Sequence, residues 1–173
     1  MGFVRSITRQ AAIRLKKDPE FSLRVFMPGM KLPPHQLDML KGMWRAVYSY
    51  ASCGRSTGKT AFTGIFLLLW CATHPSTQAL TLGLKFKTGQ LMFLFMDQML
   101  KKYPELGKCI RLTNSKAFMR RDNSEWAIEF KNNSRIATIP SDLNRKGERV
   151  RGYRASILVI DEIAAIPQEI VRQ

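Results

Sequence analysis

Apolar runs alternate with short polar or Gly/Pro-containing segments along most of this 173-residue chain. "TAFTGIFLLLWCATH", from Thr60 to His74, is apolar on nearly all sides, which is typical of a buried helix. Residues 77–84 then predict a parallel strand, and residues 88–103 predict a helix whose Met and Leu side chains fill the core. The run "SILVI", residues 156–160, predicts a central strand covered on both faces. This alternation of helices and strands predicts an α/β fold with a mostly parallel central sheet.

The segments around this core have other patterns. Residues 1–31 combine basic side chains with apolar positions at helical spacing as far as Pro19, which predicts a basic, partly helical N-terminal arm. A short helix is predicted over residues 36–44. Strand-like alternation from Ala117 to Pro140, interrupted by polar turns, predicts an antiparallel β insertion. The predicted division is therefore an arm followed by a core over residues 32–173.

One loop in this pattern has the composition of a phosphate-binding site. "SCGRSTGKT", residues 52–60, follows a predicted strand over residues 45–52 and precedes the apolar helix. It approximates G-x-x-x-x-G-K-[ST], in which backbone N–H groups surround the phosphates of a nucleotide at the positive end of a helix. Lys59 is expected to reach the β- and γ-phosphates, and the Thr60 hydroxyl to bind magnesium. The residues predicted to contact the nucleotide here are Cys53, Gly54, Arg55, Ser56, Thr57, Gly58, Lys59 and Thr60.

Two carboxylates follow the last apolar run and predict a second half of the same site. Asp161 is expected to hold magnesium through water, and Glu162 to polarise the water that attacks the γ-phosphate. Gln36 precedes the first predicted strand, and its amide matches the N7 and N6 positions of adenine; a capping or solvent-facing role is the alternative. Together these residues predict a magnesium-dependent ATPase.

The charge balance indicates a polyanionic partner. Lys and Arg number 28 against 13 Asp and Glu, for a formal net charge of +15, which favours nucleic acid over a merely solvated basic surface. The polar loop over residues 141–155 faces DNA, points at a neighbouring subunit's nucleotide, or is simply solvated. Three cysteines without a Cys-x-x-Cys pair indicate a reducing cytoplasm and no zinc site. The longest apolar stretch, residues 65–72, is shorter than the roughly 20 residues of a membrane span.

The upstream glutamine, "CGRSTGKT", the β insertion and "RVRGYRASILVIDE" resemble the ATPase domain of the large terminase subunits of tailed phages, over roughly Leu32–Pro167. The resemblance implies a P-loop NTPase fold of the RecA-like (ASCE) type. In that family the loop often lacks its first Gly and carries a basic residue where Arg55 stands. By this resemblance Arg55 would contact the γ-phosphate and act in catalysis with Lys59 and Glu162.

The same resemblance implies an assembly. Terminase motors use ATP and Mg²⁺ to drive double-stranded DNA into a prohead in the host cytoplasm, together with a portal protein and a terminase small subunit. A homo-oligomeric ring is therefore expected, with no membrane. The arginine that such motors offer in trans to the next subunit would be Arg149, Arg151 or Arg154.

Two features depart from the family pattern. The family has a coupling motif on a further strand and a C-terminal nuclease, and the chain ends at Gln173 before either. We therefore expect an incomplete sheet, ATP binding in preference to hydrolysis, and no nuclease activity. Two alternatives stay open: a superfamily 2-type helicase or translocase ATPase domain, and a nucleotide-switched DNA-binding assembly module. A GTPase is not expected, because no Asn-Lys-x-Asp motif is present.

Overall fold

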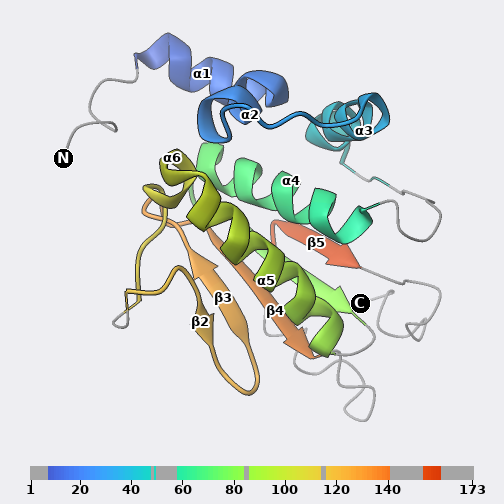
Figure 1. The fold of residues 1–173 in the computed structure, drawn as a ribbon, viewed down its shortest axis with the longest axis vertical. Helices are drawn as coiled ribbons and strands as arrows, with labels where there is room; N and C mark the ends of the chain where they lie inside the picture. Colours follow the sequence, from blue (N-terminus) through green and yellow to red (C-terminus); the bar gives the residue numbers. More distant parts are fainter. Residues whose placement is uncertain are drawn as a thin grey trace.

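In the part of the chain that the structure describes, a five-stranded sheet with helices across one face forms the centre (Figure 1). The computed structural model describes residues 8–47, 49, 58–83, 86–113, 116–140 and 154–160. Within these ranges the elements are α1 (Arg9–Lys17), α2 (Pro19–Phe26), α3 (Pro34–Arg45), α4 (Lys59–Thr73), β1 (Gln78–Gly83), α5 (Phe86–Lys102), α6 (Pro104–Gly107), β2 (Arg120–Arg121), β3 (Trp126–Glu129), β4 (Arg135–Pro140) and β5 (Ile157–Ile160). The predicted α/β class is thus confirmed.

The strand order is β2-β3-β4-β1-β5, and the described sheet is mixed. Strand β1 pairs in parallel with β4 on one side and with β5 on the other. The pairs β2–β3 and β3–β4 are antiparallel, as predicted for the insertion. Strand β4 differs from that prediction, because it also belongs to the central sheet as the parallel neighbour of β1. Alternating side chains identify a strand, but they do not specify which strands its two edges meet.

Helices α4 and α5 lie across one face of the sheet, and α1, α2 and α3 lie outside α4 (Figure 1). This sandwiched position explains the apolar sequence of α4: Leu67, Leu68 and Leu69 are all fully buried, although successive helical residues point in different directions. Met92 and Met96 of α5 are also buried, so the predicted role of its methionines in the core is confirmed. A second, smaller apolar cluster lies on the other face of the sheet and consists of Leu80, Leu82, Ala127, Ala137 and Ile139.

The N-terminal segment is helical and packs on this core. Pro19 separates α1 from α2, and the Asp18 carboxylate caps α2 by accepting a hydrogen bond from the Phe21 backbone N–H at 2.9 Å. Leu15 and Leu23 are buried in the same apolar cluster as α4. The segment predicted as an arm is therefore in apolar contact with the core, and the predicted boundary after residue 31 stays a prediction.

Helix α3 is longer than predicted and corrects the first predicted strand. That strand was expected to begin at Arg45, but Arg45 is the last helical residue, and the Ala46 N–H still donates to the Gly42 carbonyl at 3.1 Å. Ala46 has an extended backbone, but Ala46, Val47 and Ser49 belong to no strand, and Val47 is 89% exposed. Helical hydrogen bonding thus continues into a stretch whose β-branched and aromatic composition favours strand. The other residues of the predicted strand lie outside the described ranges.

Candidate functional site

The beginning of α4 has the backbone geometry of an anion-binding turn. Gly58 is the N-cap residue and has a left-handed conformation, with φ +75° and ψ +20°. Gly58 has no side chain that could cap the first turn, and that turn contains no acidic residue. The first N–H groups of a helix have no partner within the helix, and the helix dipole makes this end partly positive. The end of the helix that carries Lys59 and Thr60 therefore favours a negatively charged group.

Gln36 lies directly beside this turn. It belongs to the first turn of α3, which begins at Pro34 after the extended Pro33. A Cβ atom built on Gly58 would lie 3.4 Å from the side-chain amide nitrogen of Gln36. The structure therefore brings together two of the residues that the sequence predicts to contact a nucleotide, although they come from different helices.

The same turn faces the carboxyl edge of the parallel strands. The far end of α4 is held at the amino edge, where the Asn132 side-chain amide donates to the Cys71 carbonyl at 2.8 Å and the Ser134 hydroxyl donates to the His74 carbonyl at 2.7 Å. Because α4 has 15 residues, its first residue is about 22 Å away from that anchor. In Figure 1 the arrowheads of β1, β4 and β5 point toward the side on which α4 begins. In parallel α/β sheets this is the edge where ligands bind.

Strand β5 ends immediately before the predicted acidic residues in the sequence. Its last residue, Ile160, immediately precedes Asp161 in the sequence and is one residue beyond Val159, which pairs with Thr81 of β1. Asp161 and Glu162 themselves lie outside the described residues. So do the loop residues Cys53, Gly54, Arg55, Ser56 and Thr57 and the candidate trans-acting residues Arg149 and Arg151.

Arg154 is the one described member of the predicted trans-acting set, and it lies at the opposite edge of the sheet. Two residues later, the Ser156 N–H donates to the Gln78 carbonyl at 2.7 Å, at the amino end of β1. Arg154 also lines a small cavity of about 260 Å³ with Gln78 and Arg135. The structure therefore does not bring Arg154 to the edge where Lys59 lies.

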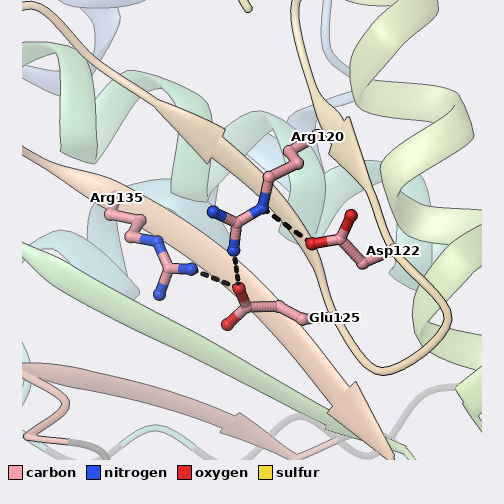
Figure 2. A network of polar contacts seen from close by, with 4 residues as sticks. All are labelled: Arg120, Asp122, Glu125 and Arg135. Atoms are coloured by element: carbon pink, nitrogen blue, oxygen red, sulfur yellow. Dashed lines mark hydrogen bonds and ion pairs between the residues drawn. The ribbon is translucent and has the colours of Figure 1, made fainter.

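A polar network that the sequence analysis missed joins the β2–β3 hairpin to β4 (Figure 2). The Glu125 carboxylate accepts hydrogen bonds from both Arg120 and Arg135, and the Arg120 Nε pairs with Asp122 at 2.9 Å. The Glu125 side chain is only 10% exposed, whereas that of Arg120 is 48% exposed. The doublet Arg120–Arg121 next to a turn with Asp122 and Glu125 was the available signal in the sequence, but Arg135, which completes the network, comes from a separate strand.

The described residues contain neither a candidate metal-binding cluster nor a candidate membrane-spanning helix. No group of three or more His, Cys, Asp or Glu side chains in these ranges lies close enough together to hold a metal ion. Likewise, none of the helices in the described ranges is both long enough and apolar enough to cross a membrane.

Comparisons with solved structures identify the fold. The chain is similar to the large terminase ATPase domain of Thermus phage P74-26, with a TM-score of 0.64 at 14% sequence identity over 91% of this chain and 62% of that chain. An arginine-to-alanine mutant of the same domain gives a TM-score of 0.63 at 13% identity, with the same coverage. No protein-family model matches the chain, and no curated protein matches its sequence.

The resemblance predicted from the sequence motifs is thus confirmed at the level of fold: the chain has the fold of a phage large terminase ATPase domain. It spans about 62% of the length of the chain that it resembles. At such low identity the likeness concerns the arrangement of the elements.

Proposed function

We propose that this chain is the nucleotide-binding part of a terminase-type motor, a P-loop ATPase that translocates double-stranded viral DNA into a prohead. One observation carries the proposal. In a chain with a terminase ATPase fold, the Gly58–Thr60 turn and Gln36 lie together on the side toward which the parallel strands point. Ligand sites of parallel α/β sheets lie at this edge.

The residues present fit a bound nucleotide with magnesium. Gly58 fits a close approach of a phosphate, because its left-handed φ favours glycine, which has no side chain in the way. The Gln36 amide lies beside it at the helix end. We assign Gln36 to the adenine and Lys59 to the β- and γ-phosphates. Thr60 and Asp161 would hold Mg²⁺, which on binding neutralises phosphate charge.

The remaining residues of the loop and of the acidic pair complete the proposed site. Cys53, Gly54, Ser56 and Thr57 present backbone N–H groups to the phosphates, and Arg55 contacts the γ-phosphate. Glu162 orients and polarises the attacking water. These roles follow from the residue types and from the family resemblance.

The proposed partners are those of a packaging motor: double-stranded DNA, a portal protein, a terminase small subunit and further copies of this chain in a ring in the host cytoplasm. The net charge of +15 supports a DNA partner. The position of Arg154 at the opposite edge from Lys59 is compatible with action on a neighbouring subunit, as proposed for Arg149, Arg151 or Arg154.

Nucleotide binding tests the proposal directly. Binding of a fluorescent, non-hydrolysable ATP analogue with magnesium is measured for the wild type, Arg55→Ala and Lys59→Ala, with the exposed Lys17→Ala of α1 as a control of equal charge change. We expect both loop variants to bind at least about tenfold more weakly, and the control to bind like the wild type. An effect of Lys59→Ala alone would remove Arg55 from the phosphate site. Absence of binding by the wild type would overturn the proposal.

Turnover separates a motor from the other classes. Glu162→Gln is expected to bind the analogue normally while hydrolysing ATP at least about 100-fold more slowly, since it keeps the shape of the site but loses the carboxylate. A switch module would keep its nucleotide-dependent DNA binding in this variant. ATP-driven separation of a DNA duplex by the wild type would favour the helicase class.

A further inference from the structure

A basic cleft lies far from the candidate nucleotide site. It has a volume of about 940 Å³ and lies between the C-terminal half of α5, residues 111–113 and 116–119, and strands β2 and β3. Strands β2 and β3 form the side of the described sheet that is farthest from β5. Glu129 of the lining is the cross-strand neighbour of Arg135, which is level with Gln78 at the amino end of β1. The α4 turn with Lys59 lies instead toward the carboxyl ends of the parallel strands.

Positive side chains dominate the cleft. Five cationic residues line it, against two carboxylates, Asp97 and Glu129; the five are Lys101, Arg111, Lys116, Arg120 and Arg121. The side chains of Lys101, Arg111, Arg120 and Arg121 are between 45% and 65% exposed.

Two buried carboxylates pair with three of these cations: Asp97 with Lys101 and Arg121, and Glu125 with Arg120. The side chains of Asp97 and Glu125 are only 11% and 10% exposed. Two further carboxylates are exposed, Glu129 in the lining (43%) and Asp122 beside it (51%), and they pair with Arg111 and Arg120. Because five exposed cations outnumber these two exposed carboxylates, a ligand meets a surface of net positive charge.

The arginines are held in fixed positions. Glu125 and Asp122 bind Arg120, as Figure 2 shows. Asp97 accepts from Arg121 at 3.5 Å and from Lys101 at 2.7 Å, and the Arg121 guanidinium lies 5.1 Å from the centre of the Trp126 ring. Side chains that are already ordered lose less conformational entropy when they bind a ligand. Guanidinium groups also match the geometry of phosphate oxygens.

We propose that this basic cleft binds the phosphate backbone of double-stranded DNA. A duplex backbone presents closely spaced negative charges to a line of cations without requiring base contacts. Stacking of single-stranded bases needs exposed aromatic faces, but in the described lining Phe118 is only partly exposed. The choice of DNA rests on the proposed packaging function, whereas the cationic cleft itself does not depend on it.

The test compares two variants that remove the same charge. Lys101→Ala/Lys116→Ala removes two exposed cations from the cleft, and Lys17→Ala/Arg24→Ala removes two exposed cations from α1 and α2. Binding of a fluorescein-labelled 25-base-pair duplex is followed by anisotropy, without nucleotide, at several salt concentrations. We expect the cleft variant to bind about tenfold more weakly, with a salt dependence reduced by about two ions, and the control to change by less than about twofold.

Several results would overturn this assignment. Equal losses in the two variants would mean that net charge alone attracts DNA, and absence of duplex binding by the wild type would exclude the cleft as a DNA site. Tighter binding of a 25-nucleotide single strand than of the duplex would exclude a duplex ligand. Binding of polyglutamate that depends on the same two lysines and exceeds DNA binding would indicate an acidic protein partner.

Nucleotide binding keeps this test distinct from the test of the proposed function. The cleft variant should bind the ATP analogue as the wild type does, because its two lysines are remote from the α4 turn. Thermal unfolding of both double variants checks that lost binding is not lost folding.

Discussion

Gln36 of α3 lies against Gly58 at the beginning of α4, and a Cβ atom at Gly58 would lie 3.4 Å from the Gln36 amide nitrogen. Gly58 also has a φ of +75°, which L-residues with a side chain adopt at a cost of about 1–2 kcal/mol. These constraints meet at one residue because α3 runs alongside α4: its first turn lies beside Gly58, and Trp44 near its other end contacts Phe66 and Trp70. The predicted adenine-contacting residue and the predicted phosphate-contacting turn therefore depend on one another.

We predict that Gly58→Ala weakens binding of an ATP analogue by at least about tenfold and lowers the free energy of unfolding by about 1–2 kcal/mol. An alanine is strained in this positive-φ conformation, and its methyl group crowds the Gln36 amide. Gly42→Ala in α3 is the control, because a Cβ there meets no atom within 4 Å, and alanine in a helix interior is expected to stabilise slightly. Equal binding by Gly58→Ala and the wild type would remove this turn from the nucleotide site.

Gly89 sets the distance between α5 and the sheet. A Cβ atom at Gly89 would lie 2.1 Å from the Thr138 Oγ1, and Thr138 is fully buried in β4. We expect Gly89→Ala to lower the free energy of unfolding by about 1–3 kcal/mol, since α5 must move away from β4. At Gly64 the nearest atom is 3.2 Å away and belongs to the flexible Met96 side chain. Urea unfolding should therefore show a clearly smaller loss for Gly64→Ala, and the reverse order would contradict this packing.

Glu125 is the central acceptor of the hairpin network. Its substitution by Gln leaves the Arg120 and Arg135 guanidinium groups without their shared carboxylate, so we expect a loss of about 1–3 kcal/mol in unfolding free energy. Asp122→Asn is the matched control; its side chain is 51% exposed and should cost less than about 1 kcal/mol. If the two variants were equally stable, Glu125 would not hold the hairpin.

His74 predicts a dependence of stability on pH. Burial lowers the pKa of His74, with a further lowering by nearby Lys16, against an opposing effect of the hydrogen bond to the Trp70 carbonyl. The imidazole ring of His74 also stacks on the Trp70 ring, with the two ring centres 3.9 Å apart. Because the folded protein resists protonation at this residue, the unfolded chain binds more protons as pH falls below about 6.5, and stability decreases.

Unfolding of the wild type between pH 7.5 and pH 5 should therefore show a loss that His74→Gln reduces. The exposed His35→Gln is the control for removal of a histidine elsewhere. An unchanged slope in His74→Gln would assign the pH dependence to other groups.

The cysteines offer a reporter of the nucleotide loop. Burial raises the pKa of Cys71 to about 12, and burial is also the main cause that raises the pKa of Cys109 to about 11. Both thiols should react slowly with iodoacetamide at pH 7.5, because the thiolate is the reactive form. We predict that an ATP analogue with magnesium slows labelling of Cys53 and leaves the other two unchanged, as measured by peptide mass spectrometry. Equal labelling of Cys53 with and without the analogue would contradict its place in the loop.

Local sequence patterns determined the helices and strands that form the core. The limits of α4, β1, α5 and β5 lie within one or two residues of those predicted, because apolar periodicity and Pro or Gly breakers act over a few residues. The two apolar helices could also be assigned to a core, since hydrophobic burial follows from the residues themselves. The prediction that the "SILVI" strand is central and covered on both faces is wrong for the described residues, because β5 is the last strand of the described sheet and Leu158 is 50% exposed. An apolar run indicates a strand, but it does not specify the position of that strand in the sheet.

Only the tertiary structure decided how these elements meet. The alternation in β4 indicated a strand, but its parallel pairing with β1 depends on the route of the chain through α5. Helix α3 runs from Pro34 to Arg45 and so includes the first residue of the predicted strand, which the residue preferences alone did not indicate. The contact of Gln36 with Gly58 and the basic cleft around Arg120 and Arg121 likewise join residues that are far apart in the sequence. Such contacts depend on the distances between elements, which the local residue pattern does not contain.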